Sequence, residues 1–173
     1  MKEIALTKGQ KCIVDDNVFE AFSKYKWYAE GRNGRYCACR RIGNKIVKMH
    51  RIILGVDNPK IAVDHINGNS LDNRSINLRT CTWAQNLRNA KLKPSNKSGY
   101  KGVCFSSKLN RFRATIKVNY KQISLGLFDC PIEAARAYNA AAILHHGEFA
   151  RLNEIPAWAN TIPTFFTPSM KPH

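Results

Sequence analysis

Apolar and polar residues alternate over short stretches in the first third of the chain. Residues 4–16, IALTKGQKCIVDD, predict a hairpin with its turn at Lys8 and Gly9. Residues 35–54, RYCACRRIGNKIVKMHRIIL, predict two further strands. Between these stretches, residues 16–27, DNVFEAFSKYKW, space their apolar side chains as an α-helix does. We therefore expect one helix among short strands.

The middle of the chain changes from strand periodicity to a helix. Residues 61–66, IAVDHI, predict a strand; an Asn-Gly turn follows, and residues 76–80, INLRT, predict the returning strand. Thr82 and Gln85 then have the spacing of a capping box, which predicts a helix over residues 83–92. The order is strand, loop, strand, helix.

A third pattern begins near residue 99. Residues 111–118, RFRATIKV, alternate strictly and predict a half-buried strand with a cationic outer face. Residues 99–106 and 121–128 predict antiparallel strands on either side of it. Residues 130–147, CPIEAARAYNAAAILHHG, predict a helix that begins at a proline, ends at a glycine and packs an alanine-rich face on the sheet.

These patterns predict an α+β fold in five segments. In chain order they are a β-rich region (1–48), a strand–strand–helix motif (49–92), a basic linker (93–98), a three-stranded sheet with one helix (99–154) and an irregular, proline-rich tail (155–173).

The charge of the chain indicates a polyanionic partner. The formal net charge is +16 and the isoelectric point is near 9.9. Between Asp72 and Asp129 no acidic residue occurs, yet the stretch holds twelve basic ones. A solvated surface usually mixes its charges, so this distribution favours a nucleic acid over a membrane surface as the partner.

The cysteines and the hydropathy favour a cytoplasmic protein. None of the six cysteines forms a CxxC pair, so we expect reduced thiols and no structural zinc. The first residues are polar and unlike a signal peptide, and no apolar run is long enough to span a bilayer. We therefore expect no membrane partner.

Asp64 and His65 stand side by side at the end of a predicted strand. Imidazole titrates near neutral pH, so His65 can take a proton from water, and a carboxylate such as that of Asp64 suits magnesium. Neighbours on a strand point to opposite faces, so the strand should bend or end at this pair, or a phosphate group should lie between the two side chains. Asn77 would orient the imidazole or brace the loop, and His50 would support the site or belong to the core. We expect Trp83 in the core.

Residues 49–92 resemble the HNH nucleases with the ββα-metal motif, especially the homing endonucleases of phages and group I introns. The resemblance rests on the lead-in MHRIILG, the Asp-His pair, an Asn thirteen residues after the Asp, and an Asn in the first turn of the helix. It implies that His65 is the general base, that Asn77 is a second catalytic residue, and that Asp64 and Asn86 bind one divalent metal ion, magnesium or else manganese.

Residues 98–153 resemble the DNA-binding domain of plant ethylene-response factors, the APETALA type, through SGYKGV, RFRATI, SLGLFD, EAARAYNAAA and GEFARLN. That family lays its sheet in the major groove. The tryptophans of the plant motif are replaced here, so no sequence preference is carried over. The resemblance implies that five cationic residues face DNA: Lys101, Arg111, Arg113, Lys117 and Lys121.

Together the two resemblances imply a site-specific homing endonuclease of a phage or mobile element, in the cytoplasm of a bacterial or phage-infected cell. It would cleave double-stranded DNA, in one strand or both, as a monomer or a transient homodimer. Two alternatives stay open. One is a non-catalytic, sequence-specific DNA-binding regulator with an inert HNH fold. The other is an RNA-binding module, which the sequence favours less because it shows no aromatic-rich stacking surface.

Overall fold

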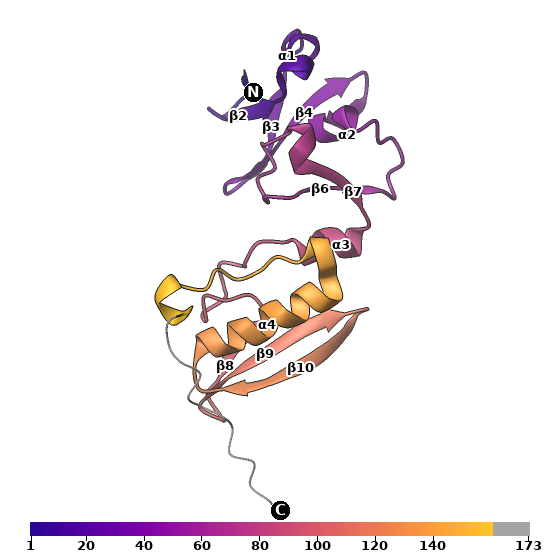
Figure 1. The fold of residues 1–173 in the computed structure, drawn as a ribbon. Helices are drawn as coiled ribbons and strands as arrows, with labels where there is room; N and C mark the ends of the chain where they lie inside the picture. Colours follow the sequence, from indigo (N-terminus) through magenta and orange to yellow (C-terminus); the bar gives the residue numbers. More distant parts are fainter. Residues whose placement is uncertain (161–173) are drawn as a thin grey trace, which may run out of the picture. The chain divides into compact units, whose positions relative to one another are not determined.

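The computed structural model describes residues 1–160, and the chain divides into two compact units, Met1–Lys91 and Leu92–His173 (Figure 1). Both units mix small antiparallel sheets with helices, so the fold class is α+β, as the sequence predicts. Within the described residues, no helix has both the length and the hydropathy needed to cross a bilayer.

The first unit opens with the predicted hairpin. Strands β1 (Lys2–Ala5) and β2 (Lys11–Val14) pair antiparallel. The turn between them places Lys8 and Gly9 at φ 58° and 64°, the left-handed region that Gly tolerates without cost. Helix α1 (Asp16–Ser23) follows, as the apolar spacing predicts.

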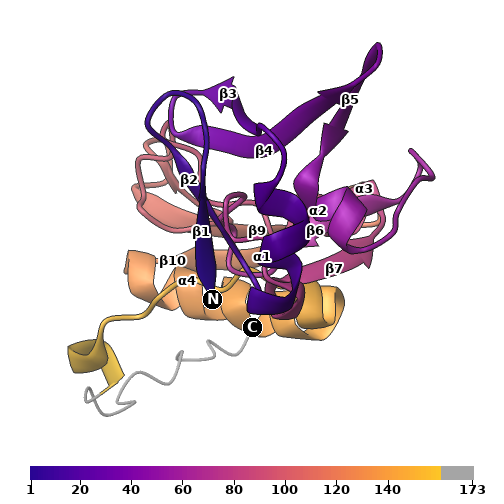
Figure 2. The ribbon, with the colours of Figure 1, turned by 90° about the horizontal axis from the view of Figure 1, so that it is seen from above.

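A three-stranded sheet of order β3–β4–β5 comes next. Its strands are β3 (Tyr28–Arg32), β4 (Arg35–Ile42) and β5 (Lys45–Lys48), and the β4–β5 hairpin projects beyond the helices of this unit (Figure 2). The prediction of strand through residue 54 is wrong, because helix α2 (Met49–Ile53) follows β5 directly. An apolar run this short is compatible with the periodicity of a strand or of a helix. In the structure it forms a helix, which buries Met49 completely in the core.

The core of the first unit joins the hairpin, the sheet and α2. Cys12 and Val14 of β2 and Met49 of α2 are fully buried in it. The Phe22 and Trp27 rings stack with their centroids 5.6 Å apart, and Trp27 donates its indole N–H to the Phe22 carbonyl. The buried members of this cluster are Ile4, Leu6, Cys12, Val14, Trp27, Ala29, Ala38 and Met49.

The strand–strand–helix motif is present in the first unit. It consists of β6 (Ala62–His65), the 3-10 turn η1 (Ser75–Asn77), β7 (Leu78–Cys81) and α3 (Trp83–Arg88), with β6 and β7 antiparallel. The capping box predicted at Thr82 is confirmed, since its hydroxyl accepts the Gln85 N–H while the Gln85 side chain accepts the Thr82 N–H.

Three details of the motif differ from expectation. Helix α3 ends at Arg88 rather than at residue 92. Asn77 lies in the turn before β7 and not on the strand. Trp83 is 60% exposed and therefore not a core residue. The last two features depend on packing, which a local pattern does not encode.

The second unit is a three-stranded sheet covered by one long helix. Strands β8 (Val103–Ser106), β9 (Arg111–Val118) and β10 (Lys121–Phe128) pair antiparallel in the order β10–β9–β8. Helix α4 (Pro131–His146) lies across one face of this sheet (Figure 1), with proline in its first turn and Gly147 after its end. These elements match the predicted ones.

Small residues allow the helix and the sheet to approach closely. Ala134 and Ala135 of α4 and Ala114 of β9 are fully buried between them. Gly102 has φ +76°, and a Cβ there would collide with the Tyr138 ring. After α4 come η2 (Gly147–Phe149) and η3 (Ala157–Asn160). The remainder of the predicted tail, residues 161–173, lies outside the described residues.

Candidate active site and nucleic-acid interface

Strand β6 is buried along its whole length and carries the Asp-His pair at its end. Asp64 is 4% exposed and His65 8%. The strand ends at His65, where the Gly68 N–H donates to the His65 carbonyl at 2.7 Å and turns the chain. The two side chains meet different neighbours, as the alternation of a strand requires.

The carboxylate of Asp64 is held from two directions. Arg79, its direct partner across the β6–β7 pair, donates from Nε at 2.9 Å and from Nη2 at 2.7 Å to Oδ2. Asn89 donates from Nδ2 to both carboxylate oxygens at 3.0 Å. The Arg79 side chain is only 14% exposed, so this ion pair is shielded from water.

Asn89 also ties the end of α3 to the turn after β6. Its Nδ2 lies 2.9 Å from the His65 carbonyl and 3.2 Å from that of Ile66. The sequence analysis missed both Asn89 and Arg79. The register of the β6–β7 hairpin, which puts Arg79 directly opposite Asp64, would have indicated Arg79. Asn89 would have been indicated by its spacing, because it follows Asn86 by three residues and so lies on the same helical face.

Asn86, the predicted metal ligand of the helix, lies in the first turn of α3 and is half-buried. Its backbone N–H donates to the Thr82 carbonyl at 3.0 Å. Within residues 1–160 no hydrogen bond joins the Asn86 side chain to Asp64. Its role as a metal ligand therefore stays a prediction.

The imidazole of His65 contacts two other buried residues. Its Nε2 lies 3.3 Å from Oδ1 of Asn73, and its ring meets the His50 ring edge-on, with centroids 5.0 Å apart and planes at 90°. Burial lowers the pKa of His65, opposed by the hydrogen bond to Asn73 and by the charges of Asp64 and Asp72. The imidazole is therefore neutral near pH 7, the form that accepts a proton.

His50 lies in α2 and is 9% exposed. Burial, followed by the charges of His65, Lys48 and Arg51, lowers its pKa to about 3. Its Nδ1 is buried without a hydrogen-bond partner among the described residues. Of the two alternatives for this histidine, contact with His65 favours support of the site.

Asn77 braces the loop between β6 and β7. Its Oδ1 accepts the Asn67 N–H at 3.0 Å, and its Nδ2 donates to the Asp72 carbonyl at 2.7 Å. Arg74 donates to both oxygens of the Asp72 carboxylate at 2.7 and 2.6 Å and lowers the pKa of that group. Of the two roles expected for Asn77, the loop contacts are the ones present, and a catalytic role stays a prediction.

A carboxylate such as that of Asp64 and an amide oxygen such as that of Asn86 are ligands that magnesium prefers, with water and substrate phosphate completing its shell. In this structure both oxygens of the Asp64 carboxylate accept hydrogen bonds, Oδ1 from Asn89 and Oδ2 from Asn89 and Arg79. Among residues 1–160 no cluster of three or more His, Cys, Asp or Glu side chains is placed to hold a metal ion. Such a cation would therefore depend on amide, water and phosphate oxygens beside the one carboxylate.

Three of the five predicted DNA contacts share one face of the second unit. The face of β9 away from α4 carries Arg111, Arg113 and Lys117. The alternating residues Ala114 and Ile116 are buried on the other face, toward α4. Arg111 forms an exposed ion pair with Asp129 at 2.8 Å. Arg113 is joined on this face by Thr115 of β9 and by β10 side chains, which line a shallow groove of about 400 Å³: Gln122, Ser124 and Leu127.

The other two predicted contacts lie elsewhere. Lys121 is paired directly with Val118, which packs toward α4. Side chains of directly paired residues share a face, so Lys121 lies on the α4 face of the sheet and not on the face of Arg113 and Lys117. Lys101 precedes β8 and is half-buried; burial and the charge of Arg151 lower its pKa to about 8. Neither Lys101 nor Lys121 therefore belongs to the set of cationic residues on the outer face of β9.

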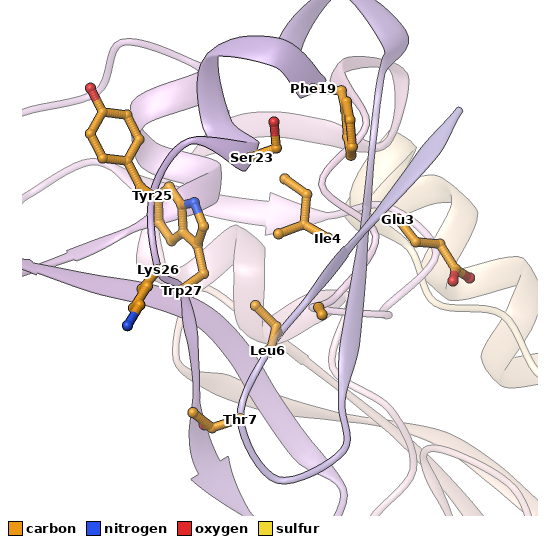
Figure 3. Close-up of a pocket in the computed structure, with 10 residues that line it drawn as sticks. Glu3, Ile4, Leu6, Thr7, Phe19, Ser23, Tyr25, Lys26 and Trp27 are labelled. Carbon is orange, nitrogen blue, oxygen red and sulfur yellow. The ribbon is translucent and has the colours of Figure 1, made fainter.

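A separate hollow in the first unit contains none of the predicted site residues. It has a volume of about 460 Å³ and lies between β1 and the end of α1, with Phe19, Tyr25 and Trp27 in its wall (Figure 3). The Arg40 guanidinium lies 3.8 Å from the Tyr25 ring centroid.

Comparison with known proteins assigns the family. The chain is 34% identical over 153 residues to an uncharacterized HNH endonuclease of Acanthamoeba polyphaga mimivirus, across 86% of this chain and 77% of the relative. It is 36% identical over 89 residues to protein 3.8 of Escherichia phage T7, across 51% and 73%. No family model and no solved structure matches. The chain belongs to the HNH endonuclease family.

Proposed function

We propose that this chain is a metal-dependent, site-specific DNA endonuclease of the homing type. The arrangement that carries the proposal is the Asp64–His65 pair at the buried end of β6, with a neutral imidazole on one side and a fixed carboxylate on the other. Membership of the HNH endonuclease family supports it. The reaction would be phosphodiester hydrolysis that leaves 5′-phosphate and 3′-hydroxyl ends.

His65 would act as the general base and take a proton from the attacking water. Asp64 and Asn86 would supply oxygen ligands for one divalent cation, magnesium or manganese. When bound, this cation polarises the scissile phosphate and stabilises charge on the leaving 3′ oxygen. Arg79 and Asn89 would keep the Asp64 carboxylate in place, because a buried carboxylate with two fixed donors loses its rotational freedom.

Double-stranded DNA would bind through the outer face of β9. Arg113 and Lys117 are both exposed there. The net charge of +16 supports attraction to a polyanion. The β8–β10 sheet and α4 are the elements that the sequence predicts, and binding of this sheet in a DNA groove stays what the resemblance to ethylene-response-factor domains implies. We propose that this unit positions the DNA and that the first unit cleaves it.

The alternative is a DNA-binding regulator with an inert HNH fold. A supercoiled plasmid library of random inserts, incubated with the full chain and magnesium or manganese, separates the two functions. We expect nicked or linear products with recurring cut sites, and none with a chelator. Selective binding of inserts without cleavage in either metal would establish the regulator and end the nuclease proposal.

A further inference from the structure

Asn73 is a fully buried polar residue in the loop between β6 and β7. Its backbone N–H donates to the Ile13 carbonyl at 2.8 Å, and its neighbour Asp72 forms a β-bridge with Ile13. Strand β2 therefore fixes the backbone of Asn73, and a side chain on so constrained a backbone has a fixed direction.

The orientation of the Asn73 amide follows from two of its contacts. Nδ2 faces the Leu71 carbonyl at 3.5 Å, and a carbonyl can only accept. The amide oxygen Oδ1 therefore faces His65, 3.3 Å from Nε2. Because Oδ1 is also only an acceptor, Nε2 must carry the hydrogen of the neutral imidazole, and the lone pair is left on Nδ1.

We propose that Asn73 is a positioning residue that holds His65 in the Nε2–H tautomer, so that Nδ1 is the nitrogen that takes the proton from water. The inference rests on the proposed role of His65 as the general base. Within residues 1–160 no hydrogen bond engages Nδ1 of His65. The edge-on ring of His50 restricts rotation of the imidazole on another side.

Asn77, which the sequence suggested for this task, is occupied elsewhere. Both polar atoms of its side chain bond to the loop, to the Asn67 N–H and the Asp72 carbonyl. Partners of this kind, one step removed from the reacting atoms, typically change activity by about 10- to 100-fold when removed.

Nitrogen-15 NMR of the full, histidine-labelled protein without metal or DNA tests the tautomer independently of nuclease activity. The His65 signals are assigned by their loss in His65→Ala. At mildly alkaline pH we expect Nε2 in the protonated range and Nδ1 in the unprotonated range. The reverse pattern in the wild type would overturn the inference, even if the protein cleaves DNA.

Two variants then test whether Asn73 is the cause. Asn73→Leu keeps the branched shape of the side chain but removes the acceptor, and we expect mixed tautomers and a cleavage rate at saturating DNA that falls about 10- to 100-fold with unchanged DNA affinity. Asn73→Asp retains an acceptor and should keep hydrogen on Nε2. An unaltered tautomer in a folded Asn73→Leu protein would contradict the proposal. If Asn73→Leu does not fold, Asn73→Asp decides. A wild-type-like cleavage rate and tautomer in Asn73→Asp would support the proposal, and an Nδ1–H tautomer in that variant would overturn it.

Discussion

Two adjacent residues of β6 are buried in contrasting ways. Asp64 is surrounded by donors from Arg79 and Asn89, which suit an ionised carboxylate. His65 is surrounded by Asn73 and the His50 ring, which suit a neutral imidazole. Removing one partner of a shielded ion pair typically costs about 3–5 kcal/mol, so Arg79 has a structural role besides any part in the reaction.

The burial of His50 makes a prediction for stability against pH. Its pKa is about 3 in the folded chain and near 6.5 in an unfolded one. Above the unfolded value both states are neutral, so the stabilisation is complete there. As the pH falls from 6.5 toward 3, only the unfolded state takes up the proton, and stability is lost. Lys48, Arg51 and His65 face this group and add to the effect.

Denaturant unfolding of wild type and His50→Phe over this pH window measures the contribution. We expect the wild type to lose up to about 1.4 kcal/mol more per pH unit than the variant. The matched control is His145→Phe, at an exposed histidine of α4, which should keep the wild-type slope. Equal slopes for wild type and His50→Phe would contradict a buried, neutral His50.

Sequence alone singled out part of the candidate site. Asp64 and His65 stand together in the chain, so a local pattern was enough to single them out. Asn73, Arg79 and Asn89 were missed because their importance arises from contacts across the hairpin, through the loop or from the helix end. Such contacts depend on register and packing.

At the scale of elements, signals confined to a few residues predicted the structure well. The Lys8–Gly9 turn, the Thr82 capping box and both ends of α4 follow from backbone preferences that act locally. The failure at α2 (Met49–Ile53) has the opposite cause, since burial of Met49 decides between strand and helix. The strict alternation of β9 predicted which of its residues share a face. Only the β9–β10 register shows that Lys121 does not lie on the same face as Arg113 and Lys117.

The cationic face of β9 makes a prediction for DNA binding. Arg113→Ala/Lys117→Ala removes two exposed charges from this face. We expect weaker binding at all sequences and a salt slope, log Kd against log salt, reduced by about 2. Fluorescence anisotropy with a target duplex at several salt concentrations measures both.

A matched control removes the same charge elsewhere. Lys24→Ala/Lys60→Ala lies at exposed positions of the first unit and should change the salt slope less. An equal reduction in both double variants would mean that total charge, and not the β9 face, governs binding.

At the scale of the whole molecule, the chain joins two compact units with separate cores. One contains the buried Asp-His pair of an HNH endonuclease, and the other presents alternating cations on an open sheet face. A division between a catalytic unit and a DNA-positioning unit predicts that cleavage and binding can be lost separately.

His65→Ala tests this account most directly, in single-turnover cleavage of a mapped target duplex with magnesium and in parallel binding measurements. We expect cleavage to fall by about 10²–10⁴-fold, the typical contribution of a general base, while DNA affinity stays unchanged. His145→Ala, at an exposed histidine, should behave as wild type in both. A His65→Ala protein that still cleaves at the wild-type rate, or that loses binding and cleavage together, would contradict the account.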